Sequence, residues 1–108
     1  MKLFAYIIIG SVFLLGQEKG IIYGTVTDHK SGELLAGVNV MVKGTYYGDA
    51  TDINGNYIIE SVNKGTYNIE ASIIGYKVVL QTRIRVKYGQ KTTVNFSMEE
   101  TVLTIGEE

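Results

Sequence analysis

The chain has 108 residues, 45% of them hydrophobic, and its ten Lys and Arg side chains against eleven Asp and Glu leave a formal net charge of −1. This length and hydrophobic content suit one domain with one modest core and do not favour a second. The balanced charge gives no electrostatic footprint for a nucleic acid. Because the chain has no cysteine, it offers no disulfides, thiolate nucleophiles or thiolate ligands for zinc.

Residues 1–16 are predicted to be a signal peptide. Lys2 supplies the positive start, and residues 3–15 form an almost unbroken apolar run. The run is shorter than the roughly 20 apolar residues of a membrane-spanning helix, which favours a cleaved export signal over an anchor. Gly16 suits the position before the cut, whereas Leu14 is larger than the residues usual there, so the position of the cut stays open.

From residue 20 to residue 98 the apolar residues recur with a period of two, which predicts an all-β domain. Strands are expected near residues 21–28, 38–43, 45–47, 50–52, 57–61, 66–74 and 77–98. The short pair can count as one strand, and a turn at Gly89 divides the last segment, which gives about seven strands. Each strand has an apolar and a polar face, most clearly along residues 76–88, so we expect an antiparallel two-sheet sandwich.

Turn signals separate these strands at short intervals. They lie at residues 29–32, 48–49, 54–55, 63–65 and 89–90. Each is expected to join neighbouring strands, which would make most strand pairings antiparallel. The strongest is the Asn54 Gly55 pair, because a type I′ hairpin needs positive φ at two successive residues. We therefore expect this pair to form such a hairpin and to set the strand register.

Several short segments together resemble a known family. They are residues 24–28 (GTVTD), 37–40 (GVNV), 43–45 (KGT), 51–57 (TDINGNY), 64–67 (KGTY) and 74–76 (IGY). The pattern is similar to the carboxypeptidase-regulatory-like domain, whose fold is a transthyretin-like (prealbumin-like) or immunoglobulin-like sandwich. The resemblance covers residues 20–98 and is most specific over residues 43–57. The family often carries proline before Gly37 and before the Lys64 Gly65 turn, and this chain has none.

The resemblance implies a role. Similar domains follow the signal peptide of TonB-dependent outer-membrane receptors, and residues 99–108 look like the start of a segment leading to a TonB box and plug. The resemblance thus implies a non-catalytic accessory or interaction domain, exported to the periplasm or outer membrane of a Gram-negative bacterium and serving nutrient uptake. Its partners would be periplasmic or outer-membrane proteins, including its own barrel or plug. The alternative is a free exported module that binds carbohydrate or acts in adhesion.

No residue set predicts catalysis, a cofactor or a metal site. His29 is the only histidine, whereas a metallocarboxypeptidase needs at least two histidine ligands for zinc. No serine lies in a nucleophile elbow. The oxygen-rich residues Asp49, Asp52, Asn54 and Asn56 do not fit the register of a calcium loop, so they are interpreted as turn formers.

Two tyrosines are the candidate ligand contacts. Tyr46 and Tyr47 lie beside a predicted hairpin tip, and one of them is expected to point outward, where an aromatic face can stack on a sugar ring. Four other tyrosines fall on the apolar side of their strands and are expected in the core: Tyr57, Tyr67, Tyr76 and Tyr88. A basic row is interpreted as a solvated strand face: Lys77, Arg83, Arg85 and Lys87.

Overall fold

The computed structural model describes residues 19–102, so the predicted signal peptide at residues 1–16 and most of the tail lie outside the described residues. The described part consists of eight strands and contains no helix, which confirms the all-β prediction. The strands are β1 (Lys19–Asp28), β2 (Asn39–Val42), β3 (Gly48–Ala50), β4 (Asn56–Asn63), β5 (Gly65–Ser72), β6 (Val79–Val86), β7 (Lys91–Thr93) and β8 (Phe96–Met98). Among these residues, no helix is long and apolar enough to cross a membrane.

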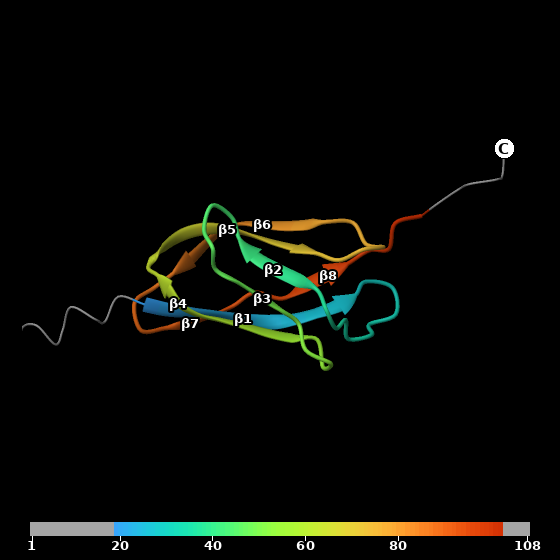
Figure 1. Cartoon of the computed structure of the whole chain (residues 1–108), viewed down its shortest axis with the longest axis horizontal. Coiled ribbons are helices and arrows are strands. Elements are labelled where there is room, and N and C mark those ends of the chain that lie inside the picture. Colours follow the sequence, from blue (N-terminus) through green and yellow to red (C-terminus); the bar gives the residue numbers. More distant parts are fainter. Residues whose placement is uncertain (1–18, 103–108) are drawn as a thin grey trace, which may run out of the picture.

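The strands form two sheets that pack face to face (Figure 1). One sheet has the order β4-β1-β7, with β8 also paired to β1, and the other has the order β3-β2-β5-β6. The predicted alternation places Val40 and Val42 of β2 inside and Asn39 and Met41 outside. The core between the sheets is made of Ile22, Val26, Val38, Val40, Val42, Tyr57, Ile59, Val62, Ile69, Ala71, Val86, Val94, Phe96 and Met98.

Two pairings differ from the antiparallel expectation, because β7 and β8 both run parallel to β1. The other four pairings are antiparallel. Among consecutive strands, β2 pairs with β3 and β5 pairs with β6, whereas the turns that lead into β4, β5 and β7 cross from one sheet to the other. The expectation that every turn joins paired neighbours was therefore wrong. A sandwich needs such crossings to bury both apolar faces against each other.

The turn at residues 52–55 is one of these crossings, and it is not a type I′ hairpin. Gly55 has a φ of 75°, but Asn54 does not have positive φ. The Gly55 N–H donates to the Asp52 carbonyl (2.9 Å), and the Asp52 carboxylate accepts the N–H groups of Asn54 (2.9 Å) and Asn56 (3.0 Å). Because the aspartate side chain organises the turn, only one residue has to adopt positive φ.

The alternation predicted for residues 76–88 is interrupted by a β-bulge. Arg83 has a φ of 57°, and the β5 to β6 register shifts between Tyr67 and Ile69. An extra residue reverses which side chains face inward, so Ile84 packs against the core while Leu80 is exposed. A second bulge lies in β4, where Ser61 has a φ of 61°. Both bulges lie on edge strands, where they discourage pairing with another chain.

Three further expectations need correction. Residues 45–47 belong to the connection between β2 and β3 instead of a strand, and β3 is Gly48–Ala50 instead of residues 50–52. Thr51 is buried, and its hydroxyl is satisfied there because it donates to the Leu35 carbonyl (2.6 Å) and accepts the Val38 N–H (2.9 Å). Tyr88 is 48% exposed, so it is not a core residue.

Candidate functional site

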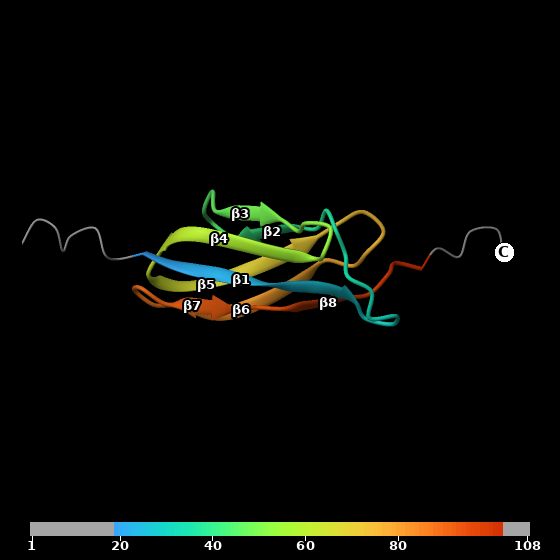
Figure 2. The ribbon, with the colours of Figure 1, turned by 90° about the horizontal axis from the view of Figure 1, so that it is seen from below.

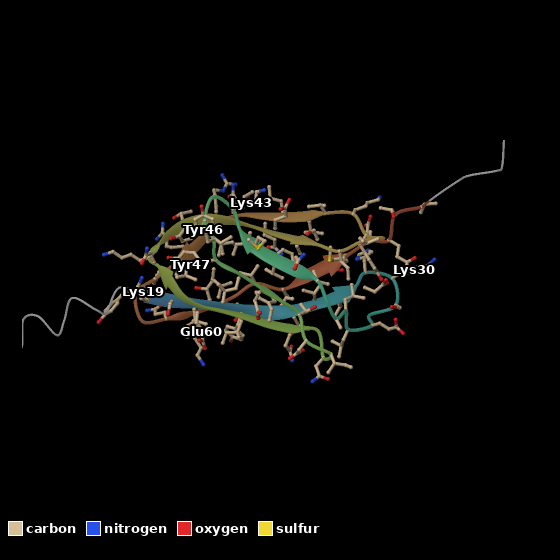
Figure 3. The ribbon with its side chains drawn as sticks, viewed as in Figure 1. Lys19, Lys30, Lys43, Tyr46, Tyr47 and Glu60 are labelled. Carbon is tan, nitrogen blue, oxygen red and sulfur yellow. The ribbon has the colours of Figure 1, made fainter. Side chains whose placement is uncertain are left out.

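The candidate contacts Tyr46 and Tyr47 lie in the turn between β2 and β3. Thr45 shapes this turn, since its hydroxyl donates to the Val42 carbonyl (2.7 Å) and accepts the Tyr47 N–H (3.0 Å). The Tyr46 side chain is fully exposed, whereas Tyr47 packs partly against the core. Figure 3 shows both tyrosines toward the end of the sandwich at which Lys19 lies. The turn therefore presents one aromatic ring to solvent and uses the other as its support.

Tyr47 is near a second tyrosine, Tyr67 of β5. Burial is the main cause that raises the pKa of Tyr67, and the neighbouring Tyr47 raises it further. The Tyr67 hydroxyl donates to the Asn63 carbonyl (2.7 Å). Tyr67 is thus held in place by a hydrogen bond and stays protonated at neutral pH.

Asp49 links the edge strands of the two sheets. Its carboxylate accepts the N–H of Ile58 in β4 at 2.9 Å. The Ile58 side chain is 46% exposed, and its direct cross-strand neighbour on β1 is Tyr23, which is 39% exposed. An apolar pair therefore lies on the outer face of the sheet, next to the tyrosine turn.

These groups border a shallow hollow of about 420 Å³, which we name the β3–β4 corner. It is lined by Tyr46, Tyr47, Gly48, Asp49, Ile58, Ile59 and Glu60. It combines aromatic and aliphatic surface with two carboxylates and tyrosine hydroxyls. Such a mixture suits recognition of a polar chain with apolar faces, such as an oligosaccharide or a peptide.

Sequence reasoning identified Tyr46 and Tyr47 in this corner but missed Ile58 and Glu60. Both alternate outward along β4, and only the crossing between the sheets brings them beside the β2 to β3 turn. Outward-facing residues on a strand give no signal by themselves of what lies next to them. The sequence predicts Asp49 as a turn former, whereas in the structure its carboxylate accepts the Ile58 N–H of β4.

The oxygen-rich residues around position 52 are already engaged with the chain itself. The Asp52 carboxylate binds two backbone N–H groups, and the Asn56 side-chain oxygen accepts the Thr25 hydroxyl at 2.8 Å. Within residues 19–102, no three His, Cys, Asp or Glu side chains are grouped so that they could hold a metal ion.

A second hydrogen-bonded cluster surrounds Asp28 at the opposite end. Its carboxylate accepts the N–H groups of Lys30 (2.8 Å) and Ser31 (2.9 Å) and the hydroxyl of Tyr76 (2.7 Å). The Ser31 N–H and then the Tyr76 hydroxyl are the largest causes that lower the carboxyl pKa of Asp28 to about 2. The same bond to Asp28, with burial as the next cause, raises the pKa of Tyr76 to about 12.

His29 follows Asp28 but faces a different partner. Its Nδ1 lies 3.0 Å from the Ser97 hydroxyl, and its side chain is in an exposed turn. The Asp28 carboxylate is engaged with the Lys30 and Ser31 N–H groups and the Tyr76 hydroxyl, so these two neighbours do not form an Asp–His pair. The Asp28 cluster therefore connects the loop that follows β1 to the turn at residues 73–76, and we interpret it as structural.

The segment after β8 is attached to this end of the sandwich. The Lys77 N–H donates to the Glu99 carbonyl (2.8 Å), and the N–H and hydroxyl of Thr101 donate to the Gly75 carbonyl (2.9 and 3.1 Å). Lys77 and Glu99 also form an ion pair of 3.3 Å. The described contacts of the sandwich thus continue to Thr101, three residues past the boundary at Met98 expected from the sequence.

Solved structures with a similar fold come from several kinds of bacterial protein. A chain of the type II cohesin–X-dockerin complex from Acetivibrio cellulolyticus has a TM-score of 0.67 and 21% identity over 82% of this chain and 63% of that one. A candidate carbohydrate-binding protein from Bacteroides uniformis has a TM-score of 0.56 and 20% identity over 72% of this chain and 40% of its own. At these identities the likeness concerns the fold alone.

Sequence comparison gives a more specific result. A segment of TonB-dependent receptor P3 from Formosa agariphila is 36% identical over 89 residues, which cover 78% of this chain and 9% of that receptor. The chain therefore spans less than a tenth of the length of this relative. The family model of the CarboxypepD_reg-like domain matches residues 22–107. This match covers most of the chain and confirms the resemblance carried by the short motifs, so the chain belongs to the carboxypeptidase-regulatory-like domain family.

Proposed function

We propose that this chain is a non-catalytic accessory domain of a TonB-dependent outer-membrane receptor and takes part in nutrient uptake by docking onto protein partners. The observation that carries this proposal is the 36% identity with a segment of such a receptor. The domain would be exported, and it would face the periplasm. Its partners would be periplasmic or outer-membrane proteins, including the plug and barrel of its own receptor.

The β3–β4 corner is the surface proposed for docking. It carries the fully exposed Tyr46 and the half-exposed Ile58 beside the carboxylates of Asp49 and Glu60. Exposed aromatic and aliphatic groups ringed by polar ones are typical of protein contacts. Neither Tyr46 nor Ile58 contributes to the buried core, so both can be changed with little effect on folding.

Variants of the corner test this surface in the full-length receptor. The double change Tyr46→Ala with Ile58→Ser is expected to lower the rate of substrate uptake while the receptor stays in the outer membrane. The matched control is Ile53→Ala with Ile74→Ser at the opposite end, where both side chains are at least 83% exposed. Equal uptake by the two double variants would reject the corner as the docking surface.

The size of the mature protein tests the receptor assignment itself. An antibody raised against residues 19–102 is expected to detect a receptor-sized protein in outer-membrane fractions. A band at the size of the isolated domain would instead favour a free exported module. Sequencing the gene beyond codon 108 gives the same distinction, because a plug and barrel would have to be encoded there.

A free carbohydrate-binding module is the second candidate function. The observation that favours it is that the fully exposed Tyr46 lines the same hollow as the two acidic residues Asp49 and Glu60. Retardation of the purified chain in gels containing polysaccharides measures such binding. Retardation that Tyr46→Ala abolishes would support this candidate, and migration unaffected by every polysaccharide tested would count against it.

A further inference from the structure

The first strand of the sandwich is bonded to the last two strands along most of its length. β1 runs parallel to β7 from Ile21 to Tyr23 and parallel to β8 from Val26 to Asp28. Figure 2 shows β7 and β8 following one another beside β1. The beginning and the end of the domain are therefore joined directly, without an intervening strand.

Hydrogen bonds outside the regular ladders extend this contact at both ends. At the start of β1, the Gly89 N–H donates to the Lys19 carbonyl (2.8 Å) and the Ile21 N–H donates to the Gln90 carbonyl (3.0 Å). At its end, the His29 N–H donates to the Met98 carbonyl (2.7 Å). We call the whole contact between residues 19–29 and residues 89–98 the β1 seam.

The interval between β7 and β8 is closed by a side chain instead of the backbone. The Asn95 side-chain oxygen accepts the Thr25 N–H at 2.9 Å, and just before it the Val94 N–H donates to the Tyr23 carbonyl at 2.8 Å. The Asn95 carbonyl in turn accepts the Gln81 side-chain amide from the other sheet (2.6 Å). Asn95 thus keeps the seam bonded where the strand itself is broken.

The first and the last of the described residues lie at opposite ends of the sandwich (Figure 1). Figure 1 shows β1 beginning at one end, while the segment after β8 leaves at the other. A pull applied to the first residues of β1 and to the segment after β8 would draw β1 in one direction and β8 in the opposite one, along their common axis. The seam bonds would then be loaded together, because parallel strands pulled from opposite ends slide past each other.

We infer that the β1 seam makes this domain resist tension applied between Lys19 and the segment after β8. The inference concerns a mechanical property of the chain itself and does not depend on which partner the domain contacts. Strands whose pulled ends lie on the same side would separate one hydrogen bond at a time and would yield at a lower force. The resistance to pulling comes from the parallel orientation of β1 relative to β7 and β8, and not from a high thermodynamic stability of these strands.

Single-molecule force spectroscopy on the full chain tests this inference. Because the natural chain has no cysteine, two introduced thiols define the pulling direction; they are kept reduced until handles are attached. Lys19→Cys with Val102→Cys loads the seam in shear. With Lys19→Cys and Gln90→Cys the force acts on neighbouring residues at the same end of the seam and peels it open. Thermal unfolding of both double variants verifies that they are folded.

The unfolding force in the shear direction is expected to be at least about twofold higher than in the peel direction, because several hydrogen bonds must break together. Equal unfolding forces in the two directions would overturn the inference.

Asn95 provides a second test within the same two proteins. Asn95→Ala is expected to lower the shear force and to leave the peel force unchanged, because peeling starts at residue 19, ahead of the Thr25 bond. Asn95→Asp keeps an oxygen acceptor and is expected to retain the shear force. A loss of equal proportion in both directions would show that Asn95 is a general stabiliser and would overturn its role in the seam.

Discussion

Replacing Gly24 by alanine is expected to destabilise the sandwich strongly. A Cβ at this position would lie 1.9 Å from the Val94 carbonyl oxygen and 2.7 Å from its carbon, whereas unbonded carbon atoms are best placed about 3.5 Å apart. The backbone at Val94 would therefore have to move by more than about 1 Å. The same residue donates its N–H to Tyr23 (2.8 Å) and accepts the Tyr57 hydroxyl, so the movement weakens two further bonds.

The expected cost follows from these contacts. Overpacking costs about 1 to 3 kcal/mol, and two weakened hydrogen bonds add about 1 kcal/mol each, which gives a loss of about 3 to 5 kcal/mol in the free energy of unfolding. For a domain of this size, about 3 kcal/mol corresponds to a fall in Tm of about 12 °C or more. Urea unfolding followed by circular dichroism measures the loss directly.

Gly32→Ala is the matched control. Gly32 has a φ of 79° and no atom within 4 Å of an added Cβ, so the change costs only the backbone strain of about 1 to 2 kcal/mol. If Gly24→Ala lost no more stability than Gly32→Ala, the close approach of β1 to residue 94 would not limit this position.

Three further predictions concern the turn, the Asp28 cluster and export. Gly55→Val should cost about 3 kcal/mol or more, since φ is positive and the new Cβ would lie 2.9 Å from the Val26 carbonyl oxygen; an unchanged Tm in thermal unfolding would contradict this. Added calcium should leave the Tm of the natural protein unchanged, and a rise in Tm would contradict the assignment of this segment as a turn without metal. The pKa of Asp28 is lowered from 3.8 to about 2, so its contribution to stability is complete above pH 3.8 and is lost as the pH falls toward 2. Asp28→Asn should flatten this acid limb, and an identical pH profile of urea unfolding would count against the cluster. N-terminal sequencing of envelope fractions should find a mature protein beginning near Gln17, whereas retention of Met1 would contradict cleavage.

The sequence was sufficient for the fold class and for most of the core. Period-two patterns in β2 and β5 place Val40, Val42, Ile69 and Ala71 inside, as the structure confirms. These patterns are local, because alternate side chains on a strand always face opposite sides. Family membership was also predictable, since the turn motifs of residues 43–57 are specific.

The pairing of strands was less predictable. A turn signal such as Asp52 to Gly55 indicates that the chain reverses, but not whether the next strand stays in the same sheet. The bulge at Arg83 carries no glycine to mark it, so the alternation of residues 76–88 looked continuous. A side chain of the neighbouring strand supports the bulge, because the Asn68 side-chain oxygen accepts the Arg83 N–H (3.2 Å).

The candidate site was predictable only in part. An exposed tyrosine beside a turn pointed to Tyr46, whereas Ile58 and Glu60 come from a strand of the other sheet. The Asp28 to Tyr76 bond joins residues 48 positions apart, and no local pattern indicates it. Contacts of this kind depend on which sheet each strand joins, which is the feature that turn chemistry leaves undetermined.

Uptake by a full-length receptor that lacks residues 19–101 tests the accessory role most directly. This deletion removes the sandwich together with the segment bonded to the Gly75 turn. The rate of uptake under limiting substrate is expected to fall, while the barrel stays inserted and binding of external ligand is largely retained. Uptake equal to that of the intact receptor would contradict the accessory role, and loss of external ligand binding would show that the sandwich is a binding module instead.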